Sequence, residues 1–133
     1  QVNIAIENVW NKFLLSPLEM RQFIDEIGSE YVGSYFDVGN VMYSGYPEQW
    51  IRILGKRIKK VHLKDYRFSP GGLNSFVDLL SGDVNWPEVM QAFDDIGYDG
   101  WAAGEMIPQY KYATDQIIYN TSKSIDRIFG RKF

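Results

Sequence analysis

The only histidine of the chain, His62, lies in the stretch "KKVHLKD", a short apolar run that is typical of a β-strand. A lone histidine is commonly a hydrogen-bonded structural residue, so its function depends on what the neighbouring strands carry. Three other apolar runs each carry a carboxylate near their end. The chemistry-bearing residues at the four run ends are Glu7, Asp37, His62 and Glu105. Three carboxylates and one imidazole suit a hard or borderline divalent ion, with Mn²⁺, Mg²⁺ or Co²⁺ favoured and Zn²⁺ possible.

Each carboxylate also has a structural explanation when it is considered alone. Glu7 and Glu105 could cap turns, and Asp37 could organise an Asx turn with the residues that follow it. The recurrence of the pattern in four runs favours a shared site. A charged group in an apolar strand is costly to desolvate unless it is paired or bound to a cation.

Four strand–helix pairs must position these residues. The apolar, β-rich runs cover residues 2–7, 32–38, 59–63 and 100–106. Helical patterns follow over residues 16–28, 46–55, 85–97 and 113–130, and the first three begin with a capping residue or a proline. This alternation predicts an α/β fold of four successive parallel β/α units, which is half of a (β/α)₈ TIM barrel. An open four-stranded doubly wound sheet is the alternative, although no glycine-rich phosphate loop follows the first strand.

The segment 66–84 is longer than an ordinary connection between a strand and a helix. Long loops at the C-terminal ends of barrel strands commonly build or cover a site. We therefore expect this segment to lie near the predicted metal ligands.

Composition excludes several classes of protein. Fourteen basic and seventeen acidic residues give a net charge of −3, which argues against a nucleic-acid partner. The chain has no cysteine, so a metal must be held by oxygen and imidazole ligands. No apolar run approaches the ~20 residues of a membrane span, and we expect a cytoplasmic protein without a membrane partner.

Five motifs carry a resemblance to a known family: "IAIEN", "YFDVGN", "KKVHLKD", "GDVNWPEV" and "DGWAAGEM". Together they resemble the sugar-phosphate isomerases and epimerases with a xylose-isomerase-like TIM barrel, in the order of that family's strands five to eight. The resemblance implies that residues 1–133 are a single half-barrel domain. This domain would be the C-terminal fragment of a longer chain that lacks here its N-terminal four β/α units, in keeping with a start at Gln1 directly before a strand pattern.

The resemblance also implies an activity. Glu7, Asp37, His62 and Glu105 would hold one divalent metal ion, and Glu7 and Glu105 would be the catalytic acid/base pair. The expected reaction is isomerisation or epimerisation of a ketose or ketose phosphate, by removal of a proton next to the carbonyl through an enediolate.

Four further residues are candidates for substrate binding. Asn40 follows Asp37 by three residues, at a place where some epimerases of the family carry a histidine. Lys64 and Arg67 could meet a sugar phosphate as counter-charges, although each could equally be a solvated charge. Trp10 could form an apolar wall over the sugar or pack against a helix.

Other activities are compatible with the same residues. Inosose dehydratases and hydroxypyruvate isomerases use similar barrels, whereas the related apurinic endonucleases use several histidines for a zinc cluster and this chain has one. The alternative from a different class is a non-catalytic half-barrel fragment or assembly module. Four parallel strands cut from a barrel leave two unpaired edges, so we expect a homo-oligomer or pairing with the missing N-terminal half.

Overall fold

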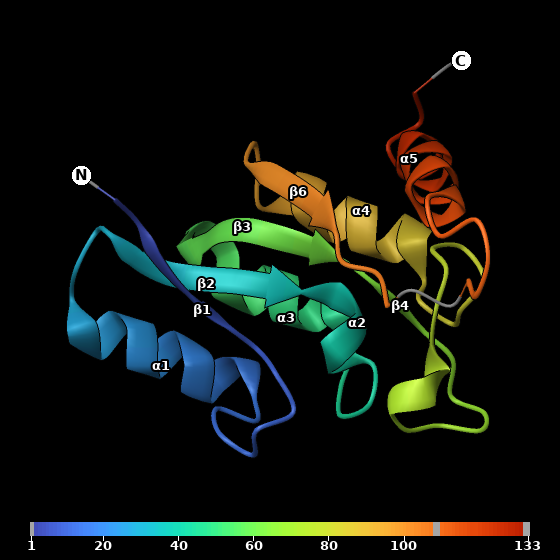
Figure 1. Ribbon diagram of the computed structural model, residues 1–133. Coiled ribbons are helices and arrows are strands. Elements are labelled where there is room, and N and C mark those ends of the chain that lie inside the picture. Colours follow the sequence, from blue (N-terminus) through green and yellow to red (C-terminus); the bar gives the residue numbers. More distant parts are fainter. Residues whose placement is uncertain (1, 108–109, 132–133) are drawn as a thin grey trace.

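A single parallel sheet organises the molecule (Figure 1). The computed structural model describes residues 2–107 and 110–131. The strand order is β1-β2-β3-β6, and all three neighbouring pairs are parallel. The strands are β1 (Ile4–Glu7), β2 (Val32–Asp37), β3 (Ile58–Leu63) and β6 (Trp101–Gly104). These strands confirm the four predicted β-runs and the α/β class.

The helices follow the strands as the sequence patterns predict. The main helices are α1 (Pro17–Ile27), α3 (Pro47–Leu54), α4 (Trp86–Asp95) and α5 (Gln116–Ile128), and the short ones are α2 (Val38–Val41), η1 (Gly55–Arg57) and η2 (Leu73–Ser75). A capping box begins α1, in which Ser16 and Glu19 exchange hydrogen bonds. At the N-cap of α4, the side chain of Asn85 accepts the backbone N–H of Glu88, as Ser16 accepts that of Glu19 in α1. Local signals therefore define where these helices start.

The hydrophobic core lies between one face of the sheet and the row of helices α1, α3 and α4 (Figure 1). Phe36 and Val61 point from the strands into this layer and are fully buried. Ile51 of α3 and Val89 of α4 meet them and are also fully buried. An open doubly wound sheet would carry helices on both faces, so the one-sided layer favours the half-barrel.

The opposite face of the sheet, which we call the open face, carries the alternate residues of the strands. This face carries Tyr35, Lys60, His62 and Trp101, because residues that are paired on neighbouring strands project to the same side of the sheet. The Trp101 side chain is 82% exposed. Within residues 2–107 and 110–131, no helix packs over this face (Figure 1).

The long segment after β3 is ordered by a small second sheet. Strand β4 (Asp65–Tyr66) pairs antiparallel with β5 (Phe76–Val77). The buried Asp65 carboxylate accepts backbone N–H groups from Tyr66, Leu80, Gly82 and Val84 and the indole N–H of Trp86. One carboxylate therefore anchors both the start and the end of this loop.

The described helices are all too short or too polar to cross a lipid bilayer.

Candidate metal centre

Glu7, Asp37, His62 and Glu105 meet at the C-terminal ends of the four parallel strands. Each residue offers one ligand atom, and these atoms lie within 4.8 Å of one another. His62 Nδ1 is 3.1 Å from Glu7 Oε1, 3.7 Å from Asp37 Oδ2 and 4.0 Å from Glu105 Oε2. The four residues that the sequence singled out are thus brought together.

Strand register accounts for this convergence. Asp37 and His62 are partners in the β2–β3 ladder, and Glu7 ends β1. The backbone N–H of Glu105 donates to the carbonyl of Leu63 at 3.0 Å, which continues the β3–β6 pairing by one residue. The rings of His62 and Tyr35 lie 4.0 Å apart, centroid to centroid, so packing limits how the imidazole can turn.

Asp37 is fully buried, and its two oxygens differ. Oδ1 accepts the backbone N–H of Asn40 at 2.8 Å and caps α2. Oδ2 has no hydrogen-bond partner within the described part of the chain. Burial raises the pKa of this carboxyl to about 7, although the nearby Lys64 ammonium lowers it. A buried carboxylate oxygen without a donor is costly, and a bound cation removes that cost, so this site fits a divalent metal.

Lys64, which the sequence suggests as a counter-charge for a sugar phosphate, belongs to the same cluster, and its pairing with the carboxylates was not predicted. Its Nζ lies 2.6 Å from Glu105 Oε2 and 3.9 Å from Asp37 Oδ2. Burial raises the pKa of the Glu105 carboxyl, but the hydrogen bond and charge of Lys64 outweigh burial and hold this pKa below its ordinary value. Glu105 is therefore ionised at neutral pH.

Asn8 is a structural partner of the centre that sequence reasoning missed. Its side-chain oxygen accepts the N–H of Asp37 at 2.8 Å, and its Nδ2 donates to the carbonyl of Asp37 at 2.9 Å. The Asn40 side chain donates to the carbonyl of Asn8 at 3.0 Å. The two asparagines join the ends of β1 and β2. The position of Asn8 directly after Glu7 was the available signal, but its partners are far away in sequence.

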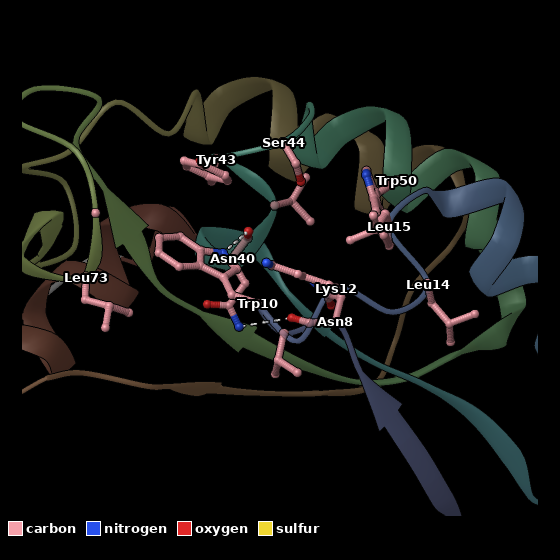
Figure 2. A pocket seen from close by; sticks show the side chains of 13 residues that line it. Asn8, Trp10, Lys12, Leu14, Leu15, Asn40, Tyr43, Ser44, Trp50 and Leu73 are labelled. Atoms are coloured by element: carbon pink, nitrogen blue, oxygen red, sulfur yellow. Dashed lines mark hydrogen bonds between the residues drawn. The ribbon is translucent and has the colours of Figure 1, made fainter.

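Trp10 borders an apolar cavity beside this asparagine pair (Figure 2). Its indole N–H donates to the carbonyl of Asn40 at 2.8 Å, and its ring packs against Tyr43, Tyr66 and Phe76. The cavity has a volume of about 580 Å³. Trp10 thus packs in an aromatic cluster and also forms a cavity wall.

Arg67 has a different environment. It is exposed, and its guanidinium donates to the carbonyl of Ser81 across the loop. Within residues 2–107 and 110–131, no hydrogen bond or ion pair joins it to the four predicted ligands. The structure therefore brings Lys64 to the centre and leaves Arg67 in the loop.

Comparisons with known proteins agree with this geometry. A family model described as "Xylose isomerase-like TIM barrel" matches residues 1–123. The inosose dehydratase of Geobacillus thermodenitrificans is 26% identical over 117 residues, which cover 75% of this chain and 39% of that protein. An IolI protein solved with a zinc atom superposes with a TM-score of 0.85 at 18% identity, over 99% of this chain and 50% of that one. A D-allulose 3-epimerase from Methylomonas sp. superposes with a TM-score of 0.75 at 17% identity. The superposition covers 95% of this chain and 48% of that one.

The chain spans between 39% and 50% of the length of these three proteins. Since the superposed structures are barrels of about twice its length, the chain has the fold of half a barrel, and the predicted fold class is confirmed.

Proposed function

The chain belongs to the xylose isomerase-like TIM barrel family, and we propose that it is the C-terminal half of a divalent-metal-dependent isomerase or epimerase acting on a ketose or ketose phosphate. The observation that carries this proposal is the convergence of Glu7, Asp37, His62 and Glu105 around the buried Asp37 oxygen that has no hydrogen-bond donor among the described residues. The missing N-terminal β/α units would close the barrel over the open face.

Glu7, Asp37, His62 and Glu105 would hold one ion, with Mn²⁺, Mg²⁺ or Co²⁺ favoured by the three carboxylates and Zn²⁺ compatible with the imidazole. When bound, such an ion supplies electrophilic stabilisation for the negative charge that develops on a carbonyl oxygen. The similarity in fold to a protein solved with a bound zinc atom supports a metal ion in this chain.

Glu7 and Glu105 would act as the acid/base pair. They lie on β1 and next to β6, the two outer strands of the four, so a substrate over the sheet ends would lie between them. One carboxylate takes the proton from the carbon next to the carbonyl. The other returns a proton on the opposite face in epimerisation, or to the adjacent carbon in isomerisation. The low pKa of Glu105 keeps it ionised, as a proton acceptor must be.

Four residues would contact the substrate in this proposal. Lys64 is already at the centre, and its ammonium suits a developing oxyanion or a phosphate. Arg67 would have to leave Ser81 to reach a phosphate. Trp10 would present its ring to the sugar. Asn40 donates its side-chain N–H to Asn8, which leaves its side-chain oxygen as the group for a substrate hydroxyl.

A second candidate is a dehydratase, because a curated relative is an inosose dehydratase. The same first step, proton removal next to a carbonyl, would then lead to loss of a neighbouring hydroxyl. A non-catalytic assembly module is the third candidate.

The test uses the full-length protein with Mn²⁺ and a panel of ketoses, ketose phosphates and inososes in D₂O. We expect deuterium at one carbon of the product, with Glu7→Gln and Glu105→Gln each lowering kcat by about 10²–10⁴. The exposed Glu26→Gln of α1 is the matched control and should retain wild-type turnover. Unchanged turnover in both site variants would refute the acid/base assignment, and dehydrated product would favour the lyase.

A further inference from the structure

Lys64 is a buried lysine whose place is built into the fold. Only 8% of its surface is exposed. A Cβ atom at Gly39 would lie 2.8 Å from Lys64 Cβ and 2.9 Å from its Cγ, so the glycine of the "DVGN" stretch makes room for the lysine stem. The ammonium lies 4.4 Å from the centroid of the Phe76 ring. The side chain is therefore held at both ends.

The ammonium contacts the same oxygens that face the imidazole. Glu105 Oε2 is 2.6 Å from Lys64 Nζ and 4.0 Å from His62 Nδ1. Asp37 Oδ2 is 3.9 Å from Lys64 Nζ and 3.7 Å from His62 Nδ1. A divalent ion shared by these oxygens and His62 would lie close to the ammonium. The two positive charges would repel each other strongly, because the site is partly buried.

The carboxylates nevertheless need a positive charge when no metal is bound, because three of them lie in one cluster. Lys64 supplies it. Lys60 lies on the same strand, but its ammonium is over the Tyr35 ring, 5.1 Å from the centroid, and it forms no ion pair with the cluster within the described residues.

We propose that Lys64 is the internal cation of the metal-free centre, that it competes with the divalent ion for Glu105 and Asp37, and that metal binding releases its ammonium from Glu105. The inference rests on the proposed metal centre and adds a limit on its affinity. Lys64 stabilises the empty site, weakens metal binding and becomes available to the substrate only after the metal is in place.

The experiment measures Mn²⁺ affinity by calorimetric titration and thermal unfolding with and without EDTA, on full-length wild type, Lys64→Met and Lys64→Gln. Methionine keeps the length of the stem, and glutamine provides a second neutral variant if methionine does not fold. We expect Mn²⁺ binding at least about tenfold tighter in the Lys64 variants. We also expect the Lys64 variants to have a lower Tm than wild type without metal. Adding Mn²⁺ should raise their Tm by more than it raises that of wild type.

Lys60→Met is the matched control, since it removes a lysine from the same strand outside the carboxylate cluster. It should bind Mn²⁺ as wild type does. Equal or weaker Mn²⁺ affinity in the Lys64 variants would overturn the inference while leaving the metal centre intact. Absence of Mn²⁺ binding in wild type would refute the proposed centre, and the inference with it.

Discussion

At the scale of single residues, the centre depends on which partner each polar atom of a side chain contacts. One oxygen of Asp37 caps α2, and the other has no hydrogen-bond donor among the residues that the structure describes. The side chain of Asn8 accepts the backbone N–H of Asp37 and donates to its backbone carbonyl, so the backbone that carries this carboxyl is fixed. A fixed, buried oxygen without a hydrogen-bond donor costs stability in the metal-free protein, and binding of a cation would recover that cost.

The titration of Asp37 makes this cost measurable. Burial raises the pKa of its carboxyl from the ordinary 3.8 to about 7, while Lys64 acts in the opposite direction. The folded state keeps the proton where the unfolded chain has lost it. The contribution of this group to stability is therefore fully present below pH 3.8 and is lost as the pH rises to about 7.

We predict that metal-free Asp37→Asn shows a smaller fall in Tm than wild type when the pH is raised from about 4.5 to about 8, because asparagine does not titrate. Thermal unfolding in EDTA across this range checks the prediction. The exposed Asp99→Asn should follow the wild-type slope. An Asp37→Asn slope as steep as that of wild type would contradict the assignment.

At the scale of elements, the carboxylate of Asp65 organises the loop between β3 and α4 through hydrogen bonds. This carboxylate accepts hydrogen bonds from five residues, Tyr66, Leu80, Gly82, Val84 and Trp86. A Cβ atom at Gly82 would overlap the carboxylate of Asp65, so the loop must pass this point as glycine. The same loop carries Phe76, which packs under the ammonium of Lys64. Order in the loop is thereby linked to the centre.

We predict that Asp65→Asn lowers the free energy of unfolding by about 3 kcal/mol, because an amide turns a donor toward groups that themselves donate and leaves N–H groups unpaired. Hydrogen exchange should increase most in residues 66–84. Asp94→Asn, on the exposed face of α4, is the control and should change stability little. An Asp65→Asn protein with wild-type stability and exchange would show that the loop is held by other contacts.

At the scale of the whole molecule, the helices of the described residues cover only one side of the sheet (Figure 1). Within the described residues, β1 and β6 each pair with a single neighbour, and Trp101 is exposed on the open face. Unpaired parallel edges and an uncovered sheet face favour association with other chains. In the proposed enzyme, this is the surface that the N-terminal half-barrel covers.

We predict that residues 1–133, expressed alone, self-associate, and that adding the N-terminal half of the full-length protein converts the oligomer to a 1:1 complex. Sedimentation velocity at several concentrations measures both. Trp101→Lys should weaken self-association, because it places a charge on the open face. Tyr112→Lys, which replaces an exposed aromatic residue outside the sheet, should not. A stable monomer at all concentrations would contradict this prediction.

The sequence by itself determined the alternation of four strands and four helices and the chemistry at the strand ends. Helix caps such as Ser16 and Asn85 and the apolar period of each segment act over a few residues, so they can be found without knowing the fold. Once the strands are parallel, their C-terminal ends must share one edge of the sheet. The grouping of Glu7, Asp37, His62 and Glu105 followed from that rule.

Only the tertiary structure decided which other side chains complete the centre. Lys64 and Arg67 are three residues apart, yet Lys64 contacts Glu105 and Arg67 turns to Ser81. Asn8 meets Asp37 across 29 positions of sequence. Such contacts depend on strand register, on the path of a long loop and on side-chain rotamers. These are set by packing between distant segments, and no local pattern in the sequence records them.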